Sequence, residues 1–180
     1  LWQVRGMDSF YLTTAPIDGG VYREGIIGTF TNANPLFATT SVDTSVSKLI
    51  FSGLFKISPR GEVVGDLADK VDVDPRGIIY TVTLRDGVHW QDGQKFSADD
   101  VVFTYKTIQN PAARSPLRSN WQGVKVAKTD EMTVVFTLPS PLSSFSYALV
   151  NGIVPEHILG EVDVEDLRSS NFNTVKPVGT

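Results

Sequence analysis

The stretch YTVTLRDGVHWQDGQKFSADDVVF, residues 80–103, is the part of the sequence that decides the fold. Along residues 80–84 apolar side chains alternate with threonine, the pattern of a half-buried β-strand. The Asp-Gly dipeptides at 86–87 and 92–93 are turn signals. The stretch therefore predicts a strand, two tight turns and, at its end, a helix.

The helix predicted at the end of this stretch has a well-marked start. Ser97 is a capping residue, and Asp100 three positions later completes a capping box. Phe96 and Val101 occupy the two positions of a hydrophobic staple, which sets the direction in which the chain enters the helix. Pro111 ends the helix, because proline disfavours helical geometry in the residue before it.

The sequence on either side of this stretch is rich in predicted strands. Val71 and Val73 alternate with acids, and the turn Asp-Pro-Arg-Gly at 74–77 joins them to a strand over 78–84. A second hairpin is predicted over 123–138, with an apolar residue at every second position of its second strand. The middle of the chain is therefore expected to form a β-sheet.

Further elements are predicted outside this β-rich middle. Residues 21–27 predict a strand, and short helices are expected after Pro141 and from Pro155. Residues 44–55 predict a helix, whose apolar side chains recur at helical spacing: Val46, Leu49, Ile50 and Leu54. Residues 1–18 show no sustained period and are interpreted as an N-terminal arm or tether. The whole pattern predicts an α+β (mixed α/β) fold.

Composition excludes several classes of function. The chain has 180 residues, 41% of them hydrophobic, and a net charge of −4, which argues against a nucleic-acid partner. It contains no cysteine, so disulfides and thiolate metal sites are excluded. No apolar run approaches the roughly 18 residues of a membrane span. The start at Leu1 instead of methionine allows for an upstream signal or membrane anchor.

The polar residues give no sign of catalytic chemistry or of a metal site. His89 and His157 lie in different predicted elements without further ligands at metal-binding spacing, so we interpret them as strand and surface residues. Asp99 and Asp100 point about 100° apart on a helix, and helix capping accounts for both. Neither a phosphate-binding glycine loop nor a nucleophile elbow is present. The protein is therefore predicted not to be an enzyme, and no cofactor is expected.

Acidic residues also gather just before the first predicted hairpin, at positions 66, 69, 72 and 74. A calcium loop requires alternating oxygen ligands, a glycine at a fixed place and a distal glutamate. This segment lacks that pattern. We therefore interpret the cluster as a solvated edge strand.

Tryptophan is the remaining candidate for ligand contact. Trp2, Trp90 and Trp121 are spread along the chain, and most aromatic side chains of a small domain fill its core. Trp121 follows a proline-containing loop over 110–120 and is kept as a candidate ligand residue. Trp90, between its two turns, is predicted to be structural.

Several segments in order resemble one protein family. The most extensive match is residues 80–103, and the others are NPL at 34–36 followed by SKLIFSGL at 47–54, GDLAD at 65–69, residues 139–145, VPEHIL at 154–159 and PVGT at 177–180. Together they resemble extracellular solute-binding protein family 5, the peptide-, dipeptide- and nickel-binding proteins of ABC importers. The resemblance covers residues 19–180.

The resemblance implies a fold and a division of the chain. Family members have a two-lobed, Venus-flytrap fold of the type II periplasmic-binding-protein kind, with an extra β-rich subdomain. Residues 19–44 would start the large lobe, 45–168 would form the small β-rich subdomain, and 169–180 would return to the large lobe. The second lobe would lie outside this sequence.

The resemblance also implies ligand-binding residues. The backbone of Thr39, Thr40 and Ser41 would face the cleft and pair with the main chain of a bound peptide in the manner of a strand. Leu117 follows Ser-Pro where the family commonly has an aromatic residue, and it is a further ligand candidate beside Trp121. No residue is assigned to a metal.

The function implied is capture of a small solute, foremost an oligopeptide, outside the cytoplasm, and its delivery to an ABC permease in the membrane. The protein would be periplasmic or on the cell surface, with a lipoprotein anchor upstream of Leu1 as one way of holding it there. An alternative from another class is a structural or interaction module that self-associates through an exposed lobe-facing surface. Light scattering after size exclusion would separate the two.

Overall fold

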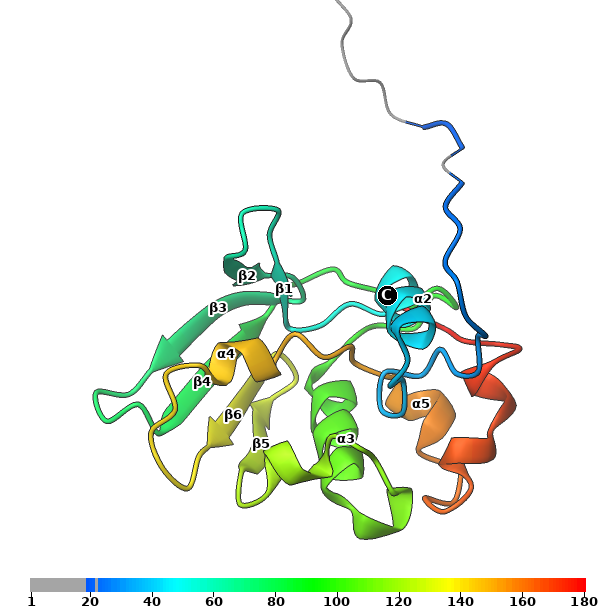
Figure 1. Cartoon of the computed structure of the whole chain (residues 1–180). Coiled ribbons are helices and arrows are strands. Elements are labelled where there is room, and N and C mark those ends of the chain that lie inside the picture. Colours follow the sequence, from blue (N-terminus) through cyan, green and yellow to red (C-terminus); the bar gives the residue numbers. More distant parts are fainter. Residues whose placement is uncertain (1–18, 22) are drawn as a thin grey trace, which may run out of the picture.

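The computed structural model describes residues 19–21 and 23–180 (Figure 1). The arm predicted for residues 1–18 lies outside the described residues. The helices and strands follow in chain order: α2 (Ser41–Ile50), β1 (Phe55–Ile57), β2 (Val63–Gly65), β3 (Ala68–Val73), β4 (Ile79–Leu84), α3 (Ala98–Gln109), β5 (Lys125–Asp130), β6 (Thr133–Thr137), α4 (Phe145–Ala148) and α5 (Glu156–Leu159).

Strands β3 to β6 form one antiparallel sheet in the order β3-β4-β6-β5. Both predicted hairpins are confirmed, and β4 pairs with β6 so that Val82 lies opposite Val134 and Tyr80 opposite Phe136. These four side chains are buried, as the alternation predicts. β3 is an edge strand on which Asp69 and Asp72 are exposed, as the interpretation of the acidic cluster predicts. Asp66 and Asp74 lie outside the strand and are partly buried, in pairs with Lys56 and Arg76.

Helix α3 has the predicted start and end. The Ser97 backbone N–H donates to Asp100 Oδ2 at 2.9 Å, and the Asp99 backbone N–H donates to Ser97 Oγ at 3.2 Å, so the capping box is formed. The helix ends at Gln109, one residue before Asn110-Pro111. It packs beside β5 and β6 and covers the sheet with its buried face (Figure 1).

Of the two elements predicted near the N-terminus, the strand is wrong and the helix is present with shifted bounds. Residues 21 and 23–27 form no strand; Ile27 is fully exposed, and within residues 19–21 and 23–180 no strand lies beside them to supply hydrogen bonds. The helix predicted over 44–55 runs from Ser41 to Ile50, because Thr40 caps it three residues earlier than expected. Leu49, assigned to its apolar face, is 87% exposed.

The chain leaves helical geometry at Phe51, and Gly53 then approaches a distant segment closely. A Cβ on this residue would lie 2.6 Å from the Val150 carbonyl oxygen, because Gly53 forms a bridge with Gly152. Leu54 and Phe55, predicted as the end of a helix, instead lead into the small hairpin of β1 and β2. Local sequence periodicity did not reveal this hairpin, since its strands have three residues each.

A single hydrophobic core connects the sheet, α3 and the segments that flank them. Tyr105 on α3 packs against Phe136 on β6, with ring centroids 5.3 Å apart. Trp90 is buried, which confirms its structural assignment, and it packs edge-on against Phe96 at 6.0 Å. Among the described residues, the Tyr105 hydroxyl is the buried side-chain polar atom left without a partner.

Asp100 joins three segments of the fold. Besides Ser97, its carboxylate accepts hydrogen bonds from the Trp90 indole N–H at 3.2 Å and from the Glu156 backbone N–H at 2.8 Å. Burial raises the pKa of Asp100 despite these donors. The carboxylate therefore fixes the start of α5 against the start of α3.

A partly exposed contact between His157 and Asp92 holds α5 at a second point. His157 Nε2 lies 2.7 Å from Asp92 Oδ2, in the turn that follows Trp90. The hydrogen bond to His157 is the first cause that holds the pKa of Asp92 below its usual value. Because this pKa is lowered in the folded state, the pair contributes stability above the unfolded pKa of Asp92 and loses it as pH falls through the folded pKa.

Replacing Asp92 by asparagine is expected to lower the free energy of unfolding at pH 7 by about 0.5 kcal/mol, as for other partly exposed pairs. The difference between the two proteins should shrink as pH falls below about 4, where the wild-type carboxylate takes up its proton. Thermal unfolding at pH 3, 5 and 7 measures this. An unchanged difference at pH 3 would contradict the assignment.

Residues 33–34 lie beside Asn173 in the last part of the chain. The Ala33 backbone N–H donates to the Asn173 carbonyl at 2.7 Å, and the buried Asn34 side-chain amide donates to Asn173 Oδ1 at 3.0 Å. The chain end is fixed by Gln91, whose backbone N–H donates to the Gly179 carbonyl at 2.8 Å. The division of the chain into lobe and subdomain at residues 44 and 168 stays a prediction.

In the described part of the chain, every helix falls short of the length and apolar character needed to cross a membrane.

Candidate functional site

Residues 39–41, predicted to face a ligand, lie exposed at the start of α2. Thr40 is the N-cap, and its Oγ1 accepts a hydrogen bond from the Asp43 backbone N–H at 3.0 Å. No described residue forms a hydrogen bond with the Thr39 backbone N–H or carbonyl. The Thr39 main chain therefore keeps one donor and one acceptor available to an extended peptide.

Asp43 holds this segment in place from the inside. Its carboxylate accepts hydrogen bonds from the Thr31 backbone N–H and hydroxyl, both at 2.7 Å, and from the Asn32 backbone N–H at 3.0 Å. Burial raises the pKa of Asp43, but the hydrogen bonds from Thr31 and Asn32 outweigh it, so the pKa lies below its usual value. The start of α2 is thereby tied to the chain that precedes it.

The structure brings the loop of Leu117 close to the same region. The buried Ser115 hydroxyl donates to the Leu36 carbonyl at 2.7 Å, although the two residues are 79 positions apart. Leu117, two residues after Ser115, is half-buried and packs against the core. This hydrogen bond therefore connects the segment just before Thr39 to the loop that contains Leu117.

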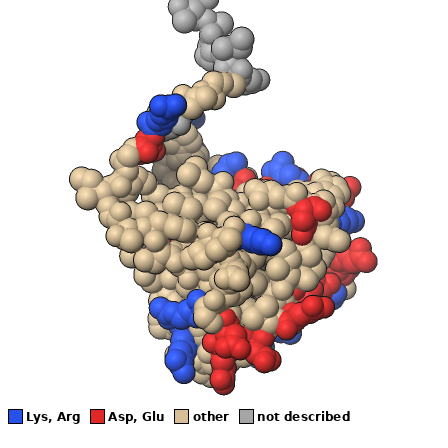
Figure 2. All heavy atoms as spheres, turned by 90° about the vertical axis from the view of Figure 1, so that its right-hand side faces the viewer, with Lys and Arg blue, Asp and Glu red and all other residues tan. Residues whose placement is uncertain are grey.

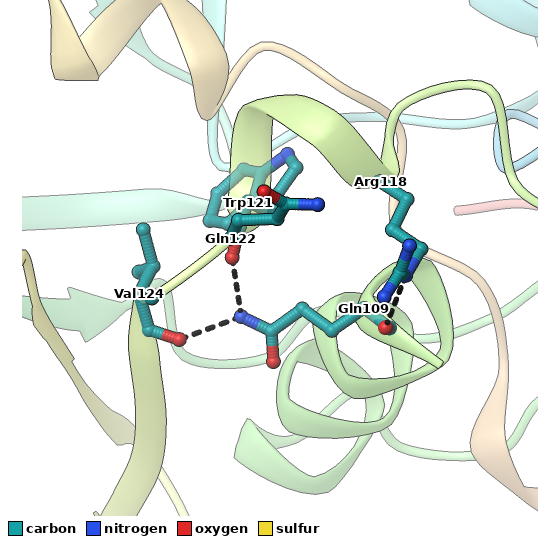
Figure 3. Close-up of a pocket in the computed structure, with 6 residues that line it drawn as sticks. Gln109, Arg118, Trp121, Gln122 and Val124 are labelled. Carbon is teal, nitrogen blue, oxygen red and sulfur yellow. Dashed lines mark hydrogen bonds between the residues drawn. The ribbon is translucent and has the colours of Figure 1, made fainter. Parts of the chain in front are cut away.

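Trp121 lies in the 3-10 helix Arg118–Trp121 and is only 2% exposed. Its indole packs against Tyr105 at 4.1 Å, Phe145 at 5.7 Å and Phe136 at 6.2 Å between ring centroids. The residue also lines an open pocket of about 300 Å³ (Figure 3). The indole is thus mainly a core side chain, and its contact with a ligand stays a prediction.

The described residues contain no group of three or more His, Asp or Glu side chains placed to hold a metal ion. His89 and His157 lie apart; His89 Nδ1 is 2.9 Å from the Gly87 carbonyl, and His157 pairs with Asp92. Asp99 pairs with Lys128 on the surface. The polar contacts of these residues are accounted for by the fold.

Two residues that shape the candidate site were missed in the sequence. The first is Asp43, which follows Thr40 by three positions, the spacing of a helix start. That spacing could have identified Asp43 and the capping role of Thr40. Ser115 carries no comparable signal, because its partner is a backbone carbonyl in a distant segment. Only the folded chain shows that contact.

Comparison with known proteins shows which family the chain resembles. Residues 62–180 match the bacterial extracellular solute-binding proteins, family 5 Middle. The oligopeptide-binding protein AppA of Bacillus subtilis (strain 168) is 32% identical over 168 residues, which cover 92% of this chain and 31% of that protein. The glutathione-binding protein GsiB of Pectobacterium atrosepticum is 33% identical over 118 residues, 65% of this chain and 23% of that protein.

Solved structures agree with this placement. The structure of AppA from Bacillus subtilis in complex with a nonapeptide matches with a TM-score of 0.81 at 32% identity, over 86% of this chain and 31% of that one. NikZ from Campylobacter jejuni in complex with Ni(L-His) matches with a TM-score of 0.77 at 35% identity, over 85% of this chain and 30% of that one. The chain therefore spans under a third of the length of these relatives. On its sequence and its mixed helix-and-sheet fold, the chain belongs to the bacterial extracellular solute-binding proteins of family 5.

Proposed function

We propose that the protein is the substrate-binding component of an ABC importer, which captures an oligopeptide outside the cytoplasm and delivers it to a membrane permease. The observation that carries this proposal is the likeness to AppA, solved with a nonapeptide, over most of this chain. GsiB and NikZ differ from AppA in the ligands that their names and titles state. The choice of a peptide therefore rests on AppA and on the site itself.

The exposed start of α2 supports a peptide ligand. An extended peptide can pair with the Thr39 main chain through its own backbone, which gives affinity without selecting particular side chains. Thr40 and Asp43 hold that main chain in one conformation before the ligand arrives. A binding surface that is already ordered avoids part of the entropic cost of association.

The surface around α2 supports a role in which another part of the protein covers it. Leu49 on α2 and Val175 near the chain end are 87% and 68% exposed. Figure 2 shows the side of the molecule that carries α2, α5 and the last residues, and a broad part of it is free of charged side chains. Closure of a second lobe over this side, with the ligand between the lobes, would stabilise the closed state.

Isothermal titration calorimetry of the complete protein tests the proposal. Mixed short peptides are expected to release heat of binding in the micromolar range or tighter, whereas sugars and a nickel–histidine chelate should give none. Binding of the chelate alone would assign a different solute. Absence of heat with every solute would exclude the proposed function.

A further inference from the structure

A polar pocket forms where the end of α3, the 3-10 helix Arg118–Trp121 and the start of β5 meet (Figure 3). Its volume is about 300 Å³, and it is open to solvent. Its lining residues come from the end of α3, the 3-10 helix and the short connection to β5: Gln109, Arg118, Trp121, Gln122, Gly123 and Val124. Of the predicted ligand residues, Trp121 is part of this lining, and Leu117 directly precedes Arg118 in the chain.

The walls of the pocket are held by hydrogen bonds. The Gln109 side-chain amide donates to the Trp121 carbonyl at 2.9 Å and to the Val124 carbonyl at 2.6 Å, which uses both of its N–H groups. Arg118 Nε donates to the Gln109 carbonyl at 3.1 Å. The three contacts connect the end of α3 to both neighbouring elements, so the shape of the pocket does not depend on a ligand.

The guanidinium of Arg118 is held along one edge only. Its Nε is bonded to Gln109, and neither terminal nitrogen forms a hydrogen bond with a residue that the structure describes. Among the described residues, no carboxylate lies within 4.0 Å of Arg118. Arg118 is also half-buried, so water screens its charge less than that of an exposed arginine.

We propose that this pocket binds a carboxylate through the two terminal nitrogens of Arg118, and that the carboxylate belongs to the solute. The planar guanidinium fork matches the two oxygens of a carboxylate, and the Gln122 side chain at the rim can supply a further donor. This inference rests on the proposed function, because it identifies the chemical class of the solute: a peptide with a free carboxylate.

A carboxylate suits the pocket better than a phosphate. The site has one cation, and that cation sits at the C-terminal end of α3, where the helix dipole is negative. A single guanidinium beside a negative helix end compensates one charge, not two. The volume of about 300 Å³ accommodates a carboxylate together with the residue that carries it.

The first experiment probes the pocket with acetate, without any peptide. In the complete protein labelled with ¹⁵N-arginine, the Arg118 Nε signal, assigned by its loss in Arg118→Gln, is expected to shift with acetate and to saturate. The signal of Arg60, exposed in the turn between β1 and β2, should respond to acetate only as it does to chloride at equal ionic strength. An Arg118 signal that behaves like that of Arg60 would overturn the proposal.

The second experiment identifies the source of the carboxylate by calorimetry with one short peptide, as the free acid and as the C-terminal amide. The wild-type protein should bind the free acid about tenfold more tightly, the usual contribution of a hydrogen-bonded charge. Arg118→Gln should remove this preference, Arg118→Lys should retain part of it, and the matched control Arg60→Gln should retain all of it.

The outcomes separate this inference from the proposed function. Peptide binding with the same preference in Arg118→Gln as in the wild type would overturn the inference and leave the function intact. Saturation by acetate with no peptide binding would assign the pocket to a free small carboxylate, and the oligopeptide function would fail. Saturation by acetate with peptides bound equally as acid and amide would overturn the assignment to the solute.

Discussion

Replacement of Trp121 by alanine is expected to lower the free energy of unfolding by about 4 kcal/mol, the usual cost of removing a large buried aromatic side chain. The indole is 2% exposed and contacts Tyr105, Phe136 and Phe145. Its loss would leave a cavity between α3 and the sheet that these rings cannot refill without leaving their rotamers. Chemical denaturation at 25 °C measures the effect.

The control for this prediction is Tyr147→Ala on α4, because Tyr147 is 58% exposed. Its effect should stay within about 0.5 kcal/mol. A Trp121→Ala protein with an unchanged denaturation midpoint would show that the indole does not support the core. If that protein also lost ligand, Trp121 would act as a wall of the ligand site instead.

Replacement of Asp100 by asparagine is expected to lower the free energy of unfolding by about 3 kcal/mol, from the lost cap and the buried donors left unpaired. Asp100 Oδ1 accepts from the Glu156 backbone N–H, and Oδ2 accepts from Ser97 and from the Trp90 indole. Both oxygens face donors, so the amide N–H₂ of asparagine would meet a donor in either orientation. Denaturant unfolding monitored by circular dichroism measures the loss.

Asp99→Asn is the matched control, since it removes the same charge from the neighbouring residue. Asp99 forms an exposed pair with Lys128 at 2.6 Å, and loss of such a pair costs about 0.5 kcal/mol. Equal effects of the two substitutions would contradict the assignment of Asp100 as the junction of three segments. Hydrogen exchange of the α5 backbone amides should be faster in Asp100→Asn than in Asp99→Asn, which would show directly that α5 is held less tightly.

Some parts of the fold follow from local sequence, and others do not. The capping box of α3 and the turns of both hairpins depend on residues within a few positions of one another, so their geometry could be predicted. The strand expected over 21–27 had the same kind of local pattern, but the described part of the chain offers it no partner strand. A strand is stable only when another strand satisfies its backbone groups, and no local pattern reports that.

The candidate site divides in the same way. Residues 39–41 and 117 were predicted from their resemblance to family motifs, and the cap at Thr40 was readable from its spacing to Asp43. The contact of Ser115 with Leu36 could not be predicted, nor could the position of Arg118, whose terminal nitrogens have no hydrogen-bond partner among the described residues. Each depends on which distant residue arrives beside it.

By itself the sequence determined a β-rich middle, a capped helix and membership of a solute-binding family, because these follow from short-range backbone preferences and from motifs in order. The tertiary structure alone decided that β4 pairs with β6, that Asp100 joins α3 to α5, and that a polar pocket opens around Arg118. The physical reason is that these contacts join residues far apart in the chain, and their energies are realised only once the core has assembled.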